Sequence, residues 1–87
     1  MVSHLWYVYL LECGDGSLYT GVTTDLARRM QVHARGTGSK YVARRGFKQL
    51  LASHACVSRS EACQYEYAIK QLPKHQKLVW FEQRRKV

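Results

Sequence analysis

Apolar residues fill positions 6–11 without a break, and a glycine-rich stretch centred near residues 14–15 separates them from a second apolar segment, residues 18–22. A continuous run of this length is typical of a strand buried on both faces. The second segment is rich in β-branched and aromatic residues, which favour strands. The pattern therefore predicts a β-hairpin that brings Tyr9 and Tyr19 nearly opposite each other on one face of a sheet, and it leaves the register open by a residue or two.

A helical pattern follows the hairpin. Thr23 and Thr24 can cap this helix, because a threonine hydroxyl accepts a hydrogen bond from an N–H of the first turn, and Gly36 is expected to end it. The positions with helical spacing are Leu26, Met30 and His33. Arg29 lies four residues before His33, so both side chains share a face that flanks this stripe.

The second half of the chain predicts one more strand and two helices. Residues 47–57 read as a strand that bends in the middle, and residues 58–61 form a capping box, which marks the start of a helix. The inward face of that helix comprises Ala62, Tyr65, Ile69 and Leu72. Pro73 ends this helix or begins a final one, which continues through residues 78–81 and leaves the basic residues 84–87 as a frayed tail.

Together these elements have the order β-β-α-β-α-α. This order predicts an α+β domain, with a small three-stranded sheet flanked by helices. A chain of 87 residues is expected to form one such domain, spanning residues 1–87.

Lysine and arginine outnumber aspartate and glutamate by 14 to 6, which gives a formal charge of +8. So large an excess indicates a polyanionic partner, and the alternative is a solvated basic face that only aids solubility. Many of the cations fall in one third of the chain, where glycines let a backbone approach phosphates and Tyr41 is available for stacking. These cations are Arg28, Arg29, Arg35, Lys40, Arg44, Arg45 and Lys48. They do not lie on one long amphipathic helix, which disfavours a membrane surface as the partner.

The three cysteines, Cys13, Cys56 and Cys63, have no C-x-x-C spacing, which argues against a disulfide framework and against a zinc site. We interpret them as reduced thiols. The first residues carry no basic region typical of a signal peptide, and the longest apolar run is too short to span a bilayer. A cytoplasmic location is therefore expected.

Four motifs occur in a fixed order along the chain: residues 6–11, residues 19–23, residues 25–29 followed by His33, and residues 61–66. Together they resemble the GIY-YIG nuclease superfamily, and most closely its short, stand-alone bacterial branch. The resemblance extends from residue 6 to about residue 78. Both signature triplets depart from the family name, since Tyr7-Val8-Tyr9 lacks the leading glycine and Tyr19-Thr20-Gly21 has threonine in the middle. Each keeps its functional tyrosine.

The resemblance implies hydrolysis of a DNA phosphodiester with one divalent metal ion, Mg²⁺ or Mn²⁺. Tyr9 would be the general base or would position the attacking water, with Tyr19 as its neighbour. Arg29 would hold the scissile phosphate, and His33 would hydrogen-bond a tyrosine or the phosphate. Glu66 would ligate the metal. A phenol is a weak base at neutral pH, so the first of these roles requires a lowered pKa of Tyr9, for example through Arg29.

Each of these roles has a structural alternative. The two tyrosines could simply pack across a hairpin, and His33 could be a core histidine. Arg29 could pair with Asp25, and Glu66 with Lys70, in surface ion pairs along a helix.

Together with the sequence pattern, the resemblance implies a cytoplasmic, Mg²⁺-dependent DNA endonuclease acting in repair or recombination, with Tyr9, Tyr19, Arg29, His33 and Glu66 meeting in one cleft. Its DNA-binding residues would be Arg28, Arg35, Lys40, Tyr41, Arg44 and Arg45. One alternative is a nucleic-acid-binding module that keeps the fold without the chemistry. Another is an interaction domain that contacts a repair protein through Trp80 and Phe81. The oligomeric state does not follow from the sequence.

Overall fold

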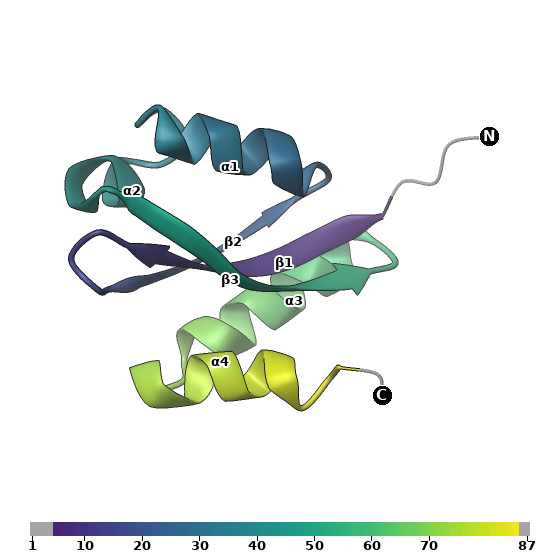
Figure 1. The fold of residues 1–87 in the computed structure, drawn as a ribbon. Helices are drawn as coiled ribbons and strands as arrows, with labels where there is room; N and C mark the ends of the chain where they lie inside the picture. Colours follow the sequence, from purple (N-terminus) through teal and green to yellow (C-terminus); the bar gives the residue numbers. More distant parts are fainter. Residues whose placement is uncertain (1–4, 86–87) are drawn as a thin grey trace.

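The computed structural model of the chain describes residues 5–85, which contain three strands and four helices (Figure 1). In chain order they are β1 (Trp6–Cys13), β2 (Leu18–Thr23), α1 (Leu26–Ala34), α2 (Lys40–Arg45), β3 (Phe47–Cys56), α3 (Arg59–Lys70) and α4 (Lys74–Glu82). The predicted α+β fold is confirmed. The order differs by one short helix, α2, in a segment whose glycines and cations predict a loop. Within residues 5–85, no helix is both long and apolar enough to cross a bilayer.

The three strands form one antiparallel sheet in the order β2-β1-β3. The central position of β1 explains its unbroken apolar run, because both of its edges are paired and both of its faces are covered. In β3 the register shifts near the middle: Leu10 pairs with Ala52, whereas Leu11 pairs with Leu50. Leu51 is thus an extra residue, which accounts for the predicted bend.

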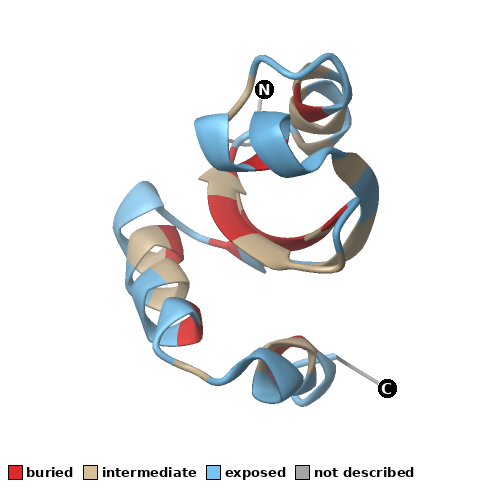
Figure 2. Cartoon of the chain, turned by 90° about the vertical axis from the view of Figure 1, so that its left-hand side faces the viewer, coloured by how far each residue is buried: buried red, intermediate tan, exposed pale blue. Residues whose placement is uncertain are grey.

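Helices cover both faces of this sheet, with α1 and α2 on one side and α3 and α4 on the other (Figure 1). Successive side chains of β1 point to opposite faces of the sheet, so this strand contributes residues to the core on both faces. Val8 and Leu10 pack in a cluster with Ile69 and other apolar residues of α3 and α4. Tyr9 and Leu11 pack in a second cluster, on the side of α1 and α2. Figure 2 shows the buried positions gathered on the strands and on the inward faces of the helices.

The structure corrects the predicted cap of α1. The N-cap residue is Asp25, whose carboxylate accepts a hydrogen bond from the N–H of Arg28 at 3.1 Å. Thr23 is not the N-cap: its hydroxyl accepts a hydrogen bond from the N–H of Asp25, at 3.1 Å. Asp25 therefore presents its carboxylate to the free N–H groups at the start of the helix, where an anion is also favoured by the helix dipole.

Helix α2 is short but capped at both ends. Ser39 accepts hydrogen bonds at its hydroxyl from the N–H groups of Tyr41 and Val42. At the other end, Gly46 has a φ of 83°, a conformation that favours glycine. A serine before the segment and a glycine after it are ordinary helix signals, so this element was readable from the sequence.

The predicted capping box begins α3. The N–H of Glu61 donates to the Ser58 hydroxyl at 3.1 Å, and the Glu61 carboxylate accepts from the N–H of Val57 at 3.0 Å. Pro73 is the N-cap residue of α4. A lysine of α4, Lys77, donates to the carbonyl of Ile69 at 2.8 Å and so ties the end of α3 to the next helix.

Two predictions for the C-terminal part do not hold. Arg84 was expected in a frayed tail, but its guanidinium lies 3.8 Å from the centre of the Trp80 ring and donates to the carbonyl of Trp80 at 3.1 Å. Trp80 and Phe81 are only 8% and 3% exposed, because they fill the core between α4 and the sheet. They therefore cannot form the proposed docking surface for a repair protein. Residues 86–87 of the predicted tail lie outside the described part of the chain.

Candidate active site

The side chain of Tyr9 packs over Gly21 of the edge strand β2. The two residues are direct partners in the β1–β2 pairing. A side-chain carbon at Gly21 would lie only 2.5 Å from the Tyr9 hydroxyl oxygen. The glycine thus leaves the space that the phenol occupies, which gives a physical reason for a glycine in the second signature triplet.

The Tyr9 hydroxyl meets His33 from helix α1. The hydroxyl oxygen and Nε2 of His33 lie 2.8 Å apart, and both residues are 2% exposed. A hydrogen bond between groups so far from water is worth more than one on the surface, and it is costly to leave unmade. The expected contact between His33 and a tyrosine is therefore present.

Tyr19 completes an aromatic cluster with this pair. The centre of its ring lies 6.3 Å from that of Tyr9 and 5.5 Å from that of His33. The predicted register is corrected here, because Tyr19 pairs with Leu11 and Tyr9 pairs with Gly21. The two tyrosines are diagonal neighbours on one face rather than opposite each other, since the turn spans residues 14–17 and so lies further along than expected.

Arg29 lies beside the cluster on α1 and lines a hollow of about 470 Å³. The other lining residues are Thr23, Thr24, Asp25, Arg28 and Val32. Within residues 5–85 Arg29 forms no ion pair, so the alternative pairing with Asp25 is absent. Its guanidinium is therefore available to an anionic ligand.

Burial governs the titration of the Tyr9–His33 pair. Desolvation raises the pKa of Tyr9 far above its ordinary value, with the neighbouring Tyr19 adding to the rise and Arg29 opposing it. Desolvation also lowers the pKa of His33, and the positive charge of Arg29 lowers it further. Arg29 thus lowers the pKa of Tyr9, as expected, but the rise caused by burial is larger. At neutral pH the Tyr9 phenol is therefore protonated and His33 is neutral.

Glu66 approaches from the other layer of the fold, on α3. One carboxylate oxygen lies 3.2 Å from the ammonium nitrogen of Lys70, so the alternative ion pair is present. Within the described chain no hydrogen bond or ion pair joins Glu66 to the tyrosines, Arg29 or His33. Its negative charge does raise the pKa of Tyr9, so the two groups are within electrostatic reach. The convergence of all five residues in one cleft stays a prediction.

A divalent metal ion fits these residues if a single protein carboxylate, that of Glu66, is its ligand. Among residues 5–85 no three His, Cys, Asp or Glu side chains gather closely enough to form a protein cage for an ion. The side chain of Glu66 is 23% exposed, and its partner Lys70 is on the surface. Such a single accessible carboxylate fits Mg²⁺, which keeps several waters and takes its remaining ligands from substrate phosphates.

The predicted DNA-binding residues lie on α1, on α2 and in the connection between these helices. Arg28, Arg35, Lys40 and Arg44 are exposed. Within residues 5–85 none of these four forms an ion pair.

Arg45 and Tyr41 are already engaged within the protein. The guanidinium of Arg45 lies 4.0 Å from the centre of the Tyr41 ring, and its Nε is 3.6 Å from the carboxylate of Asp15. Tyr41 also packs against Tyr19, with ring centres 5.8 Å apart. Arg45 therefore fixes α2 against the β1–β2 turn, and it is less free to bind phosphate than its neighbours.

Gly38 contributes to the site, although the sequence pattern points only to a flexible loop there. A side-chain carbon at this position would lie 2.9 Å from Nδ1 of His33. The bare backbone of Gly38 thus packs against the imidazole edge that faces away from Tyr9. A glycine followed by the Ser39 cap was visible in the sequence, but its contact with a ring five residues earlier required the structure.

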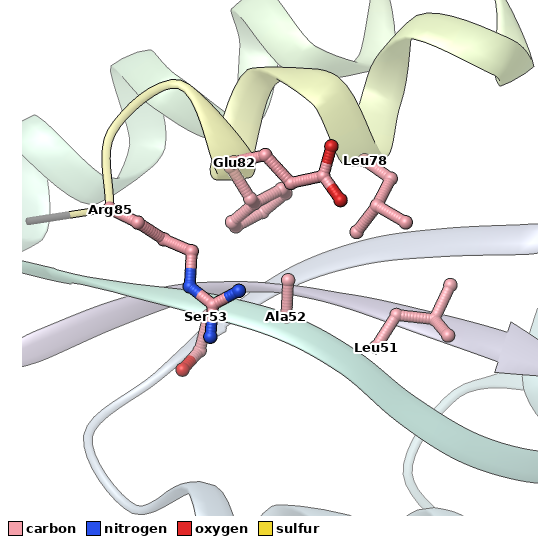
Figure 3. A pocket seen from close by; sticks show the side chains of 7 residues that line it. Leu51, Ala52, Ser53, Leu78, Glu82 and Arg85 are labelled. Carbon is pink, nitrogen blue, oxygen red and sulfur yellow. The ribbon is translucent and has the colours of Figure 1, made fainter. Parts of the chain in front are cut away.

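A second hollow, of about 320 Å³, lies between β3 and α4 (Figure 3). Its lining residues are Leu51, Ala52, Ser53, Leu78, Phe81, Glu82 and Arg85. The side chain of Arg85 points from the end of α4 toward the strand (Figure 3). None of these residues belongs to the predicted site.

Comparisons with known proteins identify the family of the chain. A model of the GIY-YIG catalytic domain matches residues 5–78. A UPF0213 protein of Xanthomonas axonopodis pv. citri is 47% identical over 77 residues, which are 88% of this chain and 76% of that protein. A UPF0213 protein of Halalkalibacterium halodurans is 51% identical over 71 residues, or 82% of this chain and 76% of that protein.

The fold is also similar to a solved structure. The solution NMR structure of a UPF0213 protein from Bacillus halodurans has a TM-score of 0.56 and 45% sequence identity, and the match covers 92% of this chain and 85% of that one. The chain therefore belongs to the GIY-YIG catalytic domain family and, within it, to the UPF0213 group of small bacterial proteins. The resemblance inferred from the sequence motifs is confirmed.

Proposed function

We propose that this chain is a metal-dependent endonuclease that hydrolyses phosphodiester bonds of DNA, with DNA repair or recombination as its setting. The observation that carries the proposal is the buried hydrogen bond between Tyr9 and His33, placed beside the unpaired guanidinium of Arg29. A core needs neither a buried polar pair nor a free cation next to it, and such groups gather at functional sites.

Arg29 would bind the scissile phosphate, because a planar guanidinium can donate two hydrogen bonds to two of its oxygens. Tyr9 would position the phosphate or the attacking water. Its raised pKa supports this positioning role over that of a proton acceptor. His33 would hold the phenol in place, and Tyr19 would close the cluster beside it.

Glu66 would hold Mg²⁺ or Mn²⁺ through its accessible carboxylate, which would first have to leave Lys70. When bound, the divalent cation would offset the negative charge that develops on the phosphate and on the leaving oxygen. The exposed cations of α1, α2 and their connection would hold the flanking DNA backbone through phosphate contacts, independently of base sequence.

A nucleic-acid-binding module without catalysis is the second candidate. The ion pair between Glu66 and Lys70 favours it, because a carboxylate that stays neutralised by a lysine is a poor metal ligand. The remaining features of the site suit both candidates, so they are separated by whether Glu66 binds a metal ion or stays paired with Lys70.

The deciding experiment measures cleavage of linear, flapped and branched DNA, with and without Mg²⁺. We expect Glu66→Ala to abolish Mg²⁺-dependent cleavage and to leave DNA affinity equal or higher, since it removes a negative charge from a protein that would bind a polyanion. Tyr9→Phe should behave similarly, because it keeps the ring and loses the hydroxyl.

Matched controls are available for both changes. Glu82→Ala removes an exposed carboxylate from α4, and Tyr67→Phe removes the hydroxyl of a tyrosine that is 69% exposed, so neither should alter cleavage. Wild-type protein that binds DNA but cleaves none of these substrates with Mg²⁺ or Mn²⁺ would contradict the nuclease proposal. Cleavage by Glu66→Ala at the wild-type rate would do the same.

A further inference from the structure

His33 carries an unsatisfied polar atom. Its Nε2 is paired with the Tyr9 hydroxyl, but Nδ1 has no hydrogen-bond partner, and it is the one buried side-chain nitrogen or oxygen within residues 5–85 in this state. Buried polar atoms nearly always have partners, so such an exception calls for a physical account. The question is whether Nδ1 carries a proton.

Gly38 lies directly against Nδ1. The site where a side-chain carbon would stand on Gly38 is 2.9 Å from Nδ1, 3.1 Å from Cε1 of the same ring and 3.1 Å from a methyl carbon of Val32. In glycine a hydrogen atom occupies that direction, so a C–H bond of Gly38 points at Nδ1. A nitrogen lone pair can accept a weak C–H contact, whereas an N–H at the same place would face another hydrogen.

Three protonation states of His33 are conceivable, and two of them place a proton on Nδ1. The imidazolium ion is disfavoured because burial and the charge of Arg29 lower the pKa of His33. The neutral form protonated on Nδ1 would leave an orphaned buried donor, which is rare and costs about 1–3 kcal/mol. The neutral form protonated on Nε2 leaves a lone pair on Nδ1, but it also leaves the Tyr9 O–H without an acceptor within residues 5–85. Each neutral form thus has one donor without a partner, and the C–H of Gly38 that faces Nδ1 favours the form with a lone pair there.

We infer that His33 is held as the neutral Nε2–H tautomer, that it donates this proton to the Tyr9 hydroxyl oxygen, and that Gly38 selects the tautomer. The Tyr9 proton is then not used inside the pair. Within residues 5–85 this proton has no acceptor, so it is available to an atom of a ligand, and His33 and Gly38 are positioning residues that set the polarity of Tyr9.

This polarity deepens the proposed function and, in its consequence for DNA, rests on it. A phenol that receives a hydrogen bond from His33 and donates its own suits a ligand atom that only accepts. The anionic oxygens of a phosphodiester are such atoms. The same phenol is a poor proton acceptor toward water, because burial raises its pKa and keeps it protonated at neutral pH.

The tautomer can be read directly by NMR, without any activity. In protein labelled with ¹⁵N at histidine, the couplings between ring carbon-bound protons and the two nitrogens show which nitrogen is protonated. The signals of His33 are identified by their loss in His33→Phe. If that variant does not fold, they are identified as the signals that shift in Tyr9→Phe, which removes the partner oxygen.

At pH 7 we expect Nε2 of His33 to be protonated and Nδ1 to be bare, both alone and with a short DNA oligonucleotide bound. A proton on Nδ1, in the neutral or the charged ring, would overturn the inference. Gly38→Ala should displace the ring and weaken the His33–Tyr9 contact, so an unchanged His33 spectrum in that variant would also count against it. The proposed nuclease activity fails separately: an inactive protein with the Nε2–H tautomer would retain the inference, and an active protein with a proton on Nδ1 would retain the activity.

Discussion

Gly21 decides where Tyr9 can lie. A β-carbon there would be 2.5 Å from the Tyr9 hydroxyl oxygen, 2.6 Å from its ring carbon Cζ and 3.1 Å from a ring carbon of Tyr19. Tyr9 has little freedom to move away, because it is 2% exposed and hydrogen-bonded to His33. One missing methyl group therefore sets the geometry of both tyrosines.

Gly21→Ala tests this dependence. We expect the free energy of unfolding to fall by about 1–3 kcal/mol, as is usual when a packed site is overfilled, and the Tyr9–His33 hydrogen bond to be lost. Urea unfolding measures the first effect. The same change in a Tyr9→Leu background, where the clashing ring is absent, should cost clearly less. Equal costs in the two backgrounds would place the clash elsewhere.

His33 makes stability depend on pH in a defined direction. Its pKa in the folded chain lies below the ordinary value of 6.5, so below about pH 6.5 the unfolded chain binds a proton that the folded chain does not. The free energy of unfolding should therefore fall as the pH is lowered from 7 toward 5. His33→Gln should flatten this slope, whereas His75→Gln, at an exposed site on α4, should leave it unchanged. A wild-type slope in His33→Gln would show that another group is responsible.

At the scale of elements, the sequence could predict whatever depends on local pattern. The alternation along β1, the bend in β3 and the capping box at Ser58 were all readable from neighbouring residues. The hairpin register was not, because a shift of one or two residues in the turn leaves the apolar pattern almost unchanged. The same holds for Gly38, whose role comes from a contact across a loop that no local pattern encodes.

The capping box also offers a quantitative check. Ser58→Ala removes the acceptor for the N–H of Glu61 and should lower the free energy of unfolding by about 1 kcal/mol. Ser60→Ala, two positions into the same helix, should change it by less than about 0.5 kcal/mol, since Ser60 is exposed. Urea unfolding of both variants compares them. A larger loss for Ser60→Ala would mean that the cap is assigned to the wrong serine.

For the whole molecule, the distribution of charge matters more than the total of +8. Several of the basic side chains are occupied: Lys48 pairs with Glu12, Arg45 with Asp15, and Arg84 with the Trp80 ring. Four exposed cations of α1, α2 and their connection form no ion pair within residues 5–85: Arg28, Arg35, Lys40 and Arg44. DNA binding should therefore be strongest on that side of the sheet.

Replacing both Lys40 and Arg44 by alanine should weaken DNA binding evenly across sequences and reduce the slope of log affinity against log salt by about two units, because each cation neutralises about one phosphate. The control is the double change of Arg59 and Lys74 to alanine, which removes the same charge from the opposite helix layer. Equal slopes for the two double variants would mean that neither helix layer is the preferred DNA-binding side. Affinity measured over a series of salt concentrations decides between these outcomes.

The two helix layers on a three-stranded sheet have one more consequence, which concerns local unfolding. Tyr9 and His33 depend on the cluster beneath α1 and α2, whereas Glu66 depends on α3, which packs in the other cluster. Helices on opposite faces can open at different free energies, as amide hydrogen exchange resolves in other proteins. Opening of α3 alone would withdraw the carboxylate and leave the aromatic pair and the basic surface in place. A partly opened molecule could thus still hold DNA while lacking the group proposed to hold the metal.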